Sequence, residues 1–572
     1  MASNLNVMIG GEAGQGVQSV GAILAKAFAR GGYHIFADQD YESRVRGGHN
    51  FFRVRISDSE VGAVCEAVDI LLALNQESIE LHRGELARGG VVVFDMEKAK
   101  GLDGGDDLFG VPLERLAKEK AGDRLMANTV ALGVAVGLVA YDSDIVADVL
   151  REHFGTAEAG ESNVRAAAAG YQYAVSNLEG RAKHSLRPLG DRKRMLINGN
   201  EAIALGAVAA GCTFMAAYPM TPATPIMEYL AGKSAELGLV VVQPEDEISA
   251  INMIIGAAFA GARAITATSG GGFCLMVEGL SLAGMTETPI VVVLGQRPGP
   301  AIGLPTRTEQ GELEFALHAG HGEFPRAVLA PATIEDAFWL TVKAFNLAEK
   351  YQVPVIIMTD QHSASSYTTV ERFDLGQVKI ERGLLLSEEE VDRLGEYKRH
   401  QITESGISPR ALPLEGKQLV VTDSDEHDEE GHITEDAETR KRMMLKRLRK
   451  LNGLKAELGQ PRVHQMPQAE ITLVGWGSTY GAIKEAAALL QKDGAAANIL
   501  HLNELWPFPA EAVSSILDGA GKSIVVENNA TGQLARLIRA ETGIKVSGSI
   551  SRFDGRPFSP EYILREMRKE VS

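Results

Sequence analysis

LNVMIGGEAGQGV, residues 5–17, opens the chain with an apolar run, a glycine-rich turn and the start of a helical pattern. Residues 5–9 have the length and the apolar character of a buried strand. From Val17 onward, apolar side chains recur at positions 20, 23, 24, 27 and 28, which is the spacing of one helix face. A strand, a glycine turn and a helix in this order predict the beginning of a doubly wound α/β domain.

The same alternation continues along most of the chain. Further strands are expected at 70–73, 90–94, 264–268, 290–294, 353–359, 471–475, 498–502 and 523–527. Short β-branched runs separated by helices predict parallel sheets. We therefore predict an α/β fold with three doubly wound domains. The expected bounds of the three domains are 1–186, 195–369 and 467–572. A linker at 187–194 is expected between the first two domains, and an irregular excursion at 370–466 between the last two.

The excursion contains a strongly acidic run at 423–436 and a basic run at 440–450 that has a helical pattern. Two interpretations stay open, a loop that covers the active site or a partner, and a solvated linker helix. His427 and His432 lie in or beside the acidic run, but the spacing matches neither HExxH nor a calcium loop. No metal site is expected on this chain.

Composition excludes several classes of protein. The 572 residues carry 57 Lys and Arg against 75 Asp and Glu, a net charge of −18, which argues against binding of a nucleic-acid backbone. Cys65, Cys212 and Cys274 lie far apart without a CxxC pair, so no local iron–sulfur or zinc site is expected. No apolar run approaches the ~20 residues that cross a bilayer. We expect a soluble, cytoplasmic protein.

The glycine-rich turn contains Gly14 and Gly16, and a second cluster at 43–48 places Arg44 and Arg46 beside a glycine pair. Backbone N–H groups at a helix N-terminus and two guanidinium groups suit a phosphate or a pyrophosphate. The glycine order is GxxGxG, whereas a dinucleotide site needs GxGxxG. A tight strand–helix turn next to a surface loop is therefore the interpretation that these residues alone favour.

Residues 218–222, Tyr-Pro-Met-Thr-Pro, form a second unusual turn. Each proline restricts the residue before it to extended conformations, so Thr221 is expected in a rigid turn with its hydroxyl available to a ligand. The alternative is a helix N-terminus near Pro225, for which Thr224 would be the better cap.

Glu247 begins a helix whose apolar positions are 251, 254, 255, 258 and 259, and it lies on the same face as these residues. Burial of a carboxylate without a partner is costly, so its position needs a reason. Attraction of acids by the helix dipole explains the neighbouring Glu245 and Asp246 better than it explains Glu247.

Two more strands end in polar turns. Ser269 and the glycines at 270–272 follow the strand at 264–268, and Arg297 follows the strand at 290–294. In open α/β sheets, ligands bind at the carboxyl ends of the strands. Thr221, Ser269 and Arg297 are therefore expected at one ligand crevice, and the glycines are expected to make room for a flat ligand or another chain.

These residues resemble the α subunit of the 2-oxoacid:ferredoxin oxidoreductases, in the form in which a γ domain is fused ahead of it. The similarity is strongest to members that act on 2-oxoglutarate, and it covers nearly the whole chain. Its segments are 11–17, 46–48, 218–222, 260–262, 297–311, 406–410, 423–432, 506–509 and 527–529. Ala13 departs from the family pattern, which more often has glycine there. The resemblance implies a Rossmann-like γ domain, a pyrimidine-binding domain and a transketolase C-terminal-like domain.

The resemblance further implies a thiamine diphosphate enzyme that converts a 2-oxoacid, CoA and oxidised ferredoxin to acyl-CoA, CO2 and reduced ferredoxin, or runs in reverse. The diphosphate motif of the family, Gly-Asp-Gly followed by Asn, does not occur in this sequence. A β subunit is therefore expected to supply the Mg²⁺–diphosphate site and the [4Fe-4S] cluster, in an (αβ)2 assembly. Pyruvate, branched-chain 2-oxoacids and indolepyruvate stay open as substrates, and a non-catalytic CoA- or nucleotide-binding scaffold stays open as a different class.

Roles follow from the same resemblance. Glu247 is expected to hydrogen-bond the cofactor's pyrimidine nitrogen and favour its imino tautomer, with Glu245 as the fallback. Arg297 and Thr221 are expected to contact the 2-oxoacid, and Arg307 is a weaker candidate for the second carboxylate of 2-oxoglutarate. The predicted cofactor contacts are Glu247, Tyr218, Pro219, Ser269, Gly270 and Gly271. CoA phosphates are assigned to Gly14, Gly16, Arg44 and Arg46, and the acidic run is assigned to gating or a subunit contact.

Overall fold

The computed structural model describes residues 4–43, 47–99, 101, 105–155, 157–178, 184–190 and 193–571. The chain divides into two compact units. The first comprises Met1–Ile197, Ser365–Arg372 and Ser559–Tyr562. The second comprises Asn198–Ala364, Phe373–Phe558 and Ile563–Ser572. Among the described residues, no helix combines the length and the apolar character that a membrane span requires.

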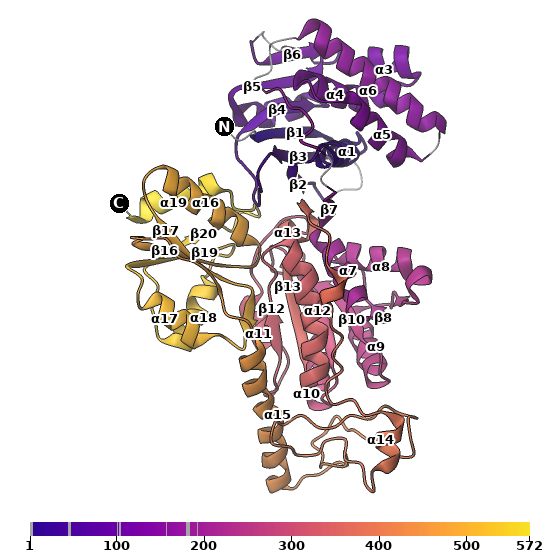
Figure 1. The fold of residues 1–572 in the computed structure, drawn as a ribbon, viewed down its shortest axis with the longest axis vertical. Coiled ribbons are helices and arrows are strands. Elements are labelled where there is room, and N and C mark those ends of the chain that lie inside the picture. Colours follow the sequence, from indigo (N-terminus) through magenta and orange to yellow (C-terminus); the bar gives the residue numbers. More distant parts are fainter. Residues whose placement is uncertain are drawn as a thin grey trace. The chain divides into compact units, whose positions relative to one another are not determined.

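The first unit is built on an eight-stranded sheet with the order β6-β5-β4-β1-β3-β2-β14-β7 (Figure 1). Its strands are β1 (Asn4–Glu12), β2 (His34–Asp40), β3 (His49–Ser57), β4 (Val68–Ala73), β5 (Leu86–Asp95), β6 (Leu108–Val111), β7 (Met195–Asn198) and β14 (Tyr367–Val370). Strands β6, β5, β4 and β1 run parallel, whereas β3 is antiparallel to both β1 and β2. The helices are α1 (Val17–Arg30), α2 (Gln76–His82), α3 (Leu113–Ala121), α4 (Ala127–Leu138), α5 (Ser143–Phe154) and α6 (Ala157–Asn177).

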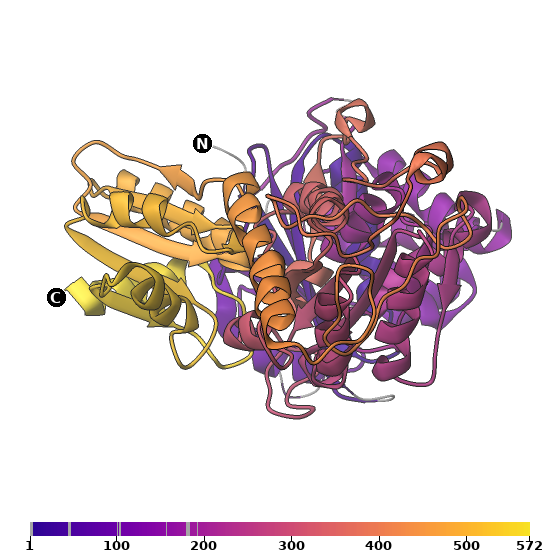
Figure 2. The ribbon, with the colours of Figure 1, turned by 90° about the horizontal axis from the view of Figure 1, so that it is seen from below.

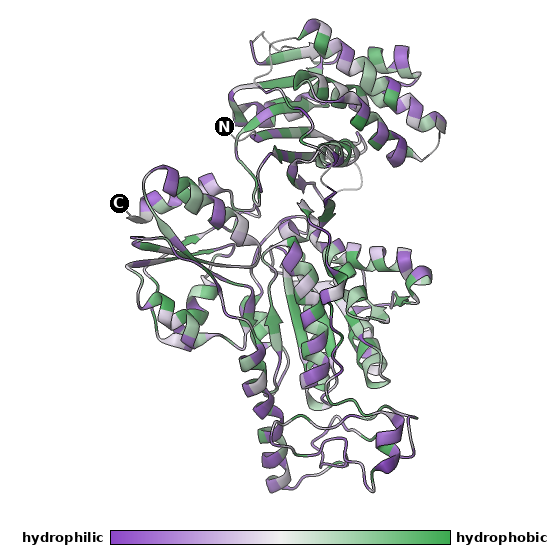
Figure 3. Cartoon of the chain, viewed as in Figure 1, coloured by the Kyte–Doolittle hydropathy of each residue, from purple (hydrophilic) through white to green (hydrophobic). Residues whose placement is uncertain are grey.

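The second unit contains a seven-stranded sheet with the order β18-β12-β13-β11-β10-β8-β9. Its strands are β8 (Phe214–Ala216), β9 (Val240–Val242), β10 (Ala264–Ser269), β11 (Ile290–Gln296), β12 (Ala327–Leu329), β13 (Pro354–Asp360) and β18 (Glu504–Trp506). Every residue of β10, β11 and β13 is buried. Figure 3 shows these central strands as hydrophobic, as expected for parallel strands covered on both faces.

The helices that alternate with these strands along the chain are α7 (Gly199–Ala209), α8 (Thr224–Leu237), α9 (Glu247–Phe259), α10 (Gly270–Met285), α11 (Leu313–His318), α12 (Ile334–Tyr351) and α13 (Gln361–Ser365). A capping box between Asn198 and Glu201 begins α7, which satisfies backbone N–H groups at the helix start.

A five-stranded sheet, β15-β17-β16-β19-β20, completes the second unit. Its elements are β15 (Arg462–His464), β16 (Ile471–Trp476), α16 (Tyr480–Lys492), β17 (Ala497–Leu502), α17 (Ala510–Leu517), β19 (Lys522–Glu527), α18 (Gln533–Thr542), β20 (Gly548–Ser551) and α19 (Pro560–Val571). One hydrophobic core includes side chains from both sheets, for example Val292 and Leu294 in β11 and Trp476 in β16. The two sheets of this unit therefore share a continuous apolar interior.

The excursion has little regular structure before α15 (Ala437–Glu457), apart from the short helix α14 (Glu388–Arg393). The helix α15 runs from the excursion toward the five-stranded sheet (Figures 1 and 2). It buries Met443, Lys446, Arg447, Lys450 and Leu454. The interpretation of this segment as a solvated linker helix is therefore wrong, because one face of the helix is packed.

The predicted α/β fold is confirmed, and the predicted strands all occur, most of them extended by one to four residues. Strands β7 and β14 lie near the two ends of the expected second domain, yet both join the sheet of the first unit. Strand β18 comes from the expected third domain and pairs with β12 of the second sheet. The expected linker is also ordered in part, since the backbone N–H of Leu189 donates to the carbonyl of Gly31 at 2.7 Å.

Candidate active site

Four of the predicted site residues lie at the carboxyl-terminal edge of the seven-stranded sheet. Thr221 follows β8, Glu247 follows β9, Ser269 ends β10 and Arg297 follows β11. These strands run parallel, so their carboxyl ends share one edge. The structure thus brings together, at one edge, residues that are up to 76 positions apart in the sequence.

Glu247 is the first residue of α9, and its side chain is buried with 3% of its surface exposed. The neighbouring Asp246 caps the helix by accepting a hydrogen bond from the Ser249 N–H at 2.7 Å. Glu247 is therefore not needed as a cap. Its Oε1 atom is buried and has no hydrogen-bond partner among the described residues. A buried acceptor without a donor is costly, which makes this atom a candidate for binding a ligand.

The glycines at the start of α10 make room for side chains of this chain. A Cβ atom on Gly272 would lie 2.1 Å from Thr268 Oγ1 and 2.4 Å from Glu247 Oε1. A Cβ atom on Gly270 would lie 2.3 Å from Oε1 of Glu312. Only Gly271 is exposed and faces open space, with its nearest neighbour at 4.0 Å. The expectation that all three glycines make room for a ligand or another chain is therefore corrected for Gly270 and Gly272, because the space beside these two is filled by side chains of this chain.

Ser269 precedes α10 at the N-cap position, but its side chain makes no capping hydrogen bond. The residue is fully buried, and its Oγ atom has no partner within the described part of the chain. Serine at this position normally bonds a backbone N–H of the first turn. Together with Glu247 Oε1, this hydroxyl is a second buried polar atom whose hydrogen bond is missing at the same edge.

Arg297 connects to the Tyr-Pro-Met-Thr-Pro turn. Its Nη1 donates to the backbone carbonyl of Thr221 at 2.7 Å. Burial lowers the pKa of the Arg297 guanidinium, and the nearby Glu312 partly opposes this effect. The alternative role of Thr224 as a helix cap is wrong, because α8 begins at Thr224 and Ala223 occupies the N-cap position.

The remaining residues predicted for this region are more exposed or lie elsewhere in the unit. Tyr218 is 39% exposed, and Pro219 is partly buried. Arg307 packs against Gly555, where an added Cβ would lie 3.0 Å from the Arg307 Cβ. Its loop also bonds the same segment, since the Thr308 N–H donates to the Gly555 carbonyl at 3.3 Å.

Sequence reasoning missed Glu312, whose Oε1 lies against Gly270. Burial raises the pKa of Glu312 to about 8, repulsion by Glu309 adds to this effect, and Arg297 opposes it. Its Oε2 atom is buried without a partner in the part of the chain that the structure describes. Position 312 carries no helical or strand periodicity, so only the folded arrangement identifies it.

In the first unit, contacts within the chain account for most of the glycine-rich turn. Strand β1 extends through Gly10 and Gly11, so the turn is shorter than expected. A Cβ on Gly11 would lie 2.8 Å from Gln15 Oε1, and one on Gly16 would lie 2.2 Å from Asn128 Nδ2. Only a Cβ on Gly14 would meet open space. Arg44 and Arg46 lie outside the described residues.

The excursion contacts the edge of the seven-stranded sheet that is opposite to Glu247 and Arg297. Arg399 donates to the carbonyls of Thr286 and Glu287, just before β11, and Lys450 donates to the carbonyl of Gln352, just before β13. Both contacts lie at the amino-terminal ends of the strands. The interpretation of the excursion as a cover for the active-site edge of its own chain is therefore wrong.

A buried ion cluster fixes the excursion in this position. Glu287 pairs with Lys446 at 2.5 Å, with Lys450, and with His400 at 3.0 Å. All four side chains are at most 1% exposed. The ring of His427 packs on that of His400 with centroids 4.0 Å apart. Among the described residues, no group of three or more His, Cys, Asp or Glu side chains is arranged to hold a metal ion.

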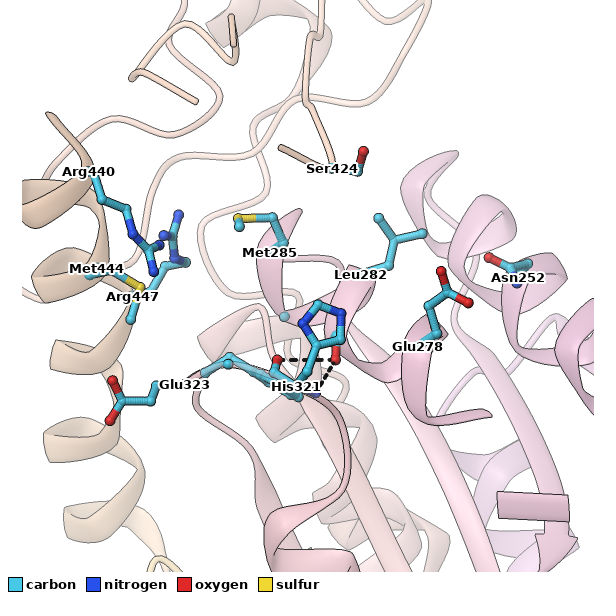
Figure 4. A pocket seen from close by; sticks show the side chains of 15 residues that line it. Asn252, Glu278, Leu282, Met285, His321, Glu323, Ser424, Arg440, Met444 and Arg447 are labelled. Carbon is cyan, nitrogen blue, oxygen red and sulfur yellow. Dashed lines mark hydrogen bonds between the residues drawn. The ribbon is translucent and has the colours of Figure 1, made fainter. Parts of the chain in front are cut away.

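A pocket of about 510 Å³ lies between the carboxyl-terminal half of α10 and α15 (Figure 4). Figure 4 shows Arg440, Met444 and Arg447 from α15 on one side and Leu282 and Met285 from α10 on another. Both arginines pair with Glu426. None of the predicted site residues lines this pocket.

Comparison with known proteins covers almost the whole chain. Residues 205–446 match the family model "Pyruvate flavodoxin/ferredoxin oxidoreductase, thiamine diP-bdg". Residues 6–173 match "Pyruvate ferredoxin/flavodoxin oxidoreductase", and residues 469–563 match "Pyruvate:ferredoxin oxidoreductase core domain II".

Individual proteins show the same similarity. The chain is 33% identical to the 2-oxoacid:ferredoxin oxidoreductase subunit alpha of a Sulfolobus species, over 97% of this chain and 95% of that protein. It is 35% identical to the 2-oxoglutarate synthase subunit KorA of Archaeoglobus fulgidus, over 66% of this chain and 99% of that protein. A solved structure, the 2-oxoglutarate:ferredoxin oxidoreductase from Magnetococcus marinus with 2-oxoglutarate, coenzyme A and succinyl-CoA bound, is 33% identical with a TM-score of 0.92 over 100% of both chains.

Proposed function

The chain belongs to the 2-oxoacid:ferredoxin oxidoreductase family, and we propose that it is the γ-fused α subunit of a thiamine diphosphate-dependent enzyme that acts on 2-oxoglutarate. In this reaction 2-oxoglutarate, CoA and two oxidised ferredoxins give succinyl-CoA, CO2, a proton and two reduced ferredoxins. The names of the Magnetococcus marinus enzyme and of the KorA relative support 2-oxoglutarate as the substrate.

The observation that carries the proposal is the buried Oε1 of Glu247 at the carboxyl edge of the sheet, which has no hydrogen-bond partner among the described residues. A carboxylate that lacks a donor fits the protonated nitrogen of an aminopyrimidine ring. Ser269 Oγ, which is also buried and has no partner in the part of the chain that the structure describes, adds a second hydrogen-bonding atom at this edge. When bound, thiamine diphosphate supplies the nucleophilic carbon that adds to the keto group and the electron sink for decarboxylation.

Glu247 is proposed to hold the pyrimidine ring and its tautomer through Oε1. Tyr218, Pro219, Ser269, Gly270 and Gly271 are proposed to line the same cofactor site. Exclusion of water around Glu247 strengthens its hydrogen bond, because electrostatic interactions increase in a medium of low dielectric constant.

Arg297 and Thr221 are proposed to bind the 2-oxoacid. The Arg297 guanidinium uses Nη1 for the Thr221 carbonyl, and this bond holds the group toward the turn while leaving its other N–H donors for a carboxylate. The Thr221 hydroxyl is proposed to contact the carboxylate or the keto oxygen. Arg307 is proposed as the weaker partner of the second carboxylate of 2-oxoglutarate.

The rest of the active site is assigned to a β subunit. This subunit is proposed to carry the Mg²⁺–diphosphate site and the [4Fe-4S] cluster, to pass electrons to ferredoxin, and to assemble with this chain as (αβ)2. The absence of a Gly-Asp-Gly motif from this sequence supports the division. CoA phosphates are proposed to bind near Gly14 and Gly16 with Arg44 and Arg46.

The test is an anaerobic purification of the tagged chain from its own cells, followed by CoA-dependent viologen reduction with separate 2-oxoacids. Activity with 2-oxoglutarate that needs thiamine diphosphate, with a brown partner chain co-eluting, supports the proposal. Activity only with pyruvate, a branched-chain 2-oxoacid or indolepyruvate would keep the class and change the substrate. No partner and no reduction with any 2-oxoacid would favour a non-catalytic CoA-binding scaffold.

A further inference from the structure

A cavity of about 620 Å³ in the first unit has an unusual charge. No acidic residue belongs to the described residues that line it, whereas five of these eleven residues are basic, namely Lys26, Arg30, Lys193, Arg194 and Arg372. The chain as a whole carries a net charge of −18, so the cavity is a local exception. Its volume is typical of cavities that hold small molecules. None of the residues proposed for the cofactor, the 2-oxoacid or CoA lines it.

One face of α1 supplies nearly half of the lining. At the spacing of a single helix face, it contributes Ala22, Ala25, Lys26, Ala29 and Arg30. The three alanines keep this face low, because a methyl group fills little space. Lys26 and Arg30 both pair with Glu152, whose side chain is 51% exposed and does not line the cavity. A single carboxylate cannot neutralise two cations, so this wall keeps a positive charge.

Arg194, from the end of the expected linker, is fixed beside the cavity. Its Nη1 donates to the Gly32 carbonyl at 3.3 Å, and its Nε donates to Glu371 at 2.9 Å. The Arg194 side chain is only 9% exposed, whereas that of Glu371 is 80% exposed. The guanidinium is thus nearly buried while its carboxylate partner lies in solvent. Its Nη2 has no hydrogen-bond partner among the described residues and is available to a ligand.

Two further lining residues indicate which anion fits. Arg372 lies two positions after β14 and makes no ion pair with any described residue. Tyr367, in β14, brings the one aromatic ring among the described lining residues, and this ring lies near that of Phe52, with centroids 6.4 Å apart. Guanidinium groups match the oxygens of a phosphate, and an aromatic ring is a surface for a nucleic-acid base. A cleft lined by one sign of charge also concentrates ions of the opposite sign.

We propose that this cavity binds a nucleotide that carries at least two phosphate groups. Its phosphates pair with Arg194 and Arg372, and its base lies against the alanines of α1 and the ring of Tyr367. The bound polyanion supplies the negative charge that the lining lacks. A free nucleoside triphosphate and the nucleotide end of CoA share this chemistry, so the experiment separates these two sources.

The test titrates ATP into the purified full-length assembly by calorimetry, without CoA. The wild type should bind one ATP per copy of this chain. Arg372→Gln should bind it about tenfold more weakly, because one charged hydrogen bond to a phosphate is lost. Ala22→Leu should abolish binding, because the larger side chain fills the floor of the cavity. Arg124→Gln is the matched control and should bind ATP as the wild type does, since Arg124 is also exposed and without an ion pair among the described residues but does not line the cavity.

A repeat of the titration at saturating CoA identifies the source. Unchanged ATP binding assigns the cavity to a free nucleotide, and displacement of ATP assigns it to the nucleotide end of CoA. Thermal unfolding checks that Ala22→Leu is folded. If it is not, Arg372→Glu replaces it, because reversal of an exposed charge leaves the packing intact, and it should abolish ATP binding.

Two results would overturn the inference. The first is a wild-type assembly that binds no ATP at about 1 mM. The second is ATP binding that persists at wild-type affinity in Arg372→Gln or in the folded cavity-filling variant, which would place the nucleotide elsewhere. Neither result depends on the oxidation of a 2-oxoacid, so the inference and the proposed function fail separately.

Discussion

Glu287→Gln is expected to release the excursion from the edge of the seven-stranded sheet. Glu287 is the ion-pair partner of two buried ammonium groups, those of Lys446 and Lys450. Glutamine keeps the size of the side chain and can still bond His400, but it leaves both lysines without this counter-charge. Removal of one member of a buried pair costs about 3–5 kcal/mol, because the remaining charge stays buried and unpaired.

The matched control is Glu152→Gln in the first unit. Glu152 also pairs with two cations, Lys26 and Arg30, but its side chain is 51% exposed. An exposed pair contributes about 0.2–1 kcal/mol, so this variant should lose less than about 1 kcal/mol. The contrast between the two variants isolates burial, since both acids pair with two cationic side chains of Lys or Arg.

Hydrogen exchange measured by mass spectrometry on the full chain is the assay. In Glu287→Gln, amides of α15 and of the segment around His400 should exchange about 100-fold faster or more, which corresponds to a loss of about 3 kcal/mol or more. Glu287→Met combined with Lys446→Met and Lys450→Met should recover most of the protection, because no charge of this group is then left uncompensated. Less than about a fivefold change in Glu287→Gln, or a triple variant as labile as the single one, would refute the reasoning.

Three more predictions concern the same unit. Acidification should loosen the excursion below about pH 6.5. Burial lowers the pKa of His400, and although burial opposes them, Lys446 and Lys450 hold the pKa of Glu287 well below its usual range, so the unfolded state binds more protons than the folded state as the pH falls. Hydrogen exchange at pH 5 and at pH 7.5 measures the effect, and equal protection at the two pH values would contradict it. Gly272→Ala should weaken thiamine diphosphate binding at least about tenfold and destabilise the chain by about 1–3 kcal/mol, because the added methyl group would collide with Thr268 and Glu247. Gly271→Ala should leave stability unchanged, and calorimetry of both variants tests the contrast. Arg297→Lys should raise KM for the 2-oxoacid about 10- to 100-fold, because the bidentate geometry is lost, and an unchanged KM would remove Arg297 from the substrate site.

Local patterns were sufficient for much of the fold. The β-branched runs of β11 and β13 predict buried parallel strands because their own composition requires burial on both faces. Glu247 could be singled out because the apolar face of α9 continues through its position, and the structure buries it there. The proline-rich turn at Thr221 was recognisable because prolines restrict the backbone before them.

Other features depend on contacts between distant segments and leave no periodic signal. Glu312 directly precedes the short helix α11, and its carboxyl group packs against Gly270, which comes much earlier in the chain. Strand β14 is four residues long and pairs with β2, which lies near the start of the sequence. The charged pattern of α15 predicts an exposed helix. The sequence does not reveal that Glu287 is a buried ion-pair partner of two lysines of this helix, Lys446 and Lys450. In each case the decisive partner lies outside any local window.

The central claim, that Glu247 belongs to half of a thiamine diphosphate active site, is tested most directly by Glu247→Gln. CoA-dependent viologen reduction with 2-oxoglutarate is compared between wild type and variant, both purified anaerobically with their partner at saturating thiamine diphosphate. We predict a loss of at least about 100-fold, since glutamine cannot replace the carboxylate, with the fold and the partner retained. Activity equal to that of the wild type in an intact assembly would contradict the account.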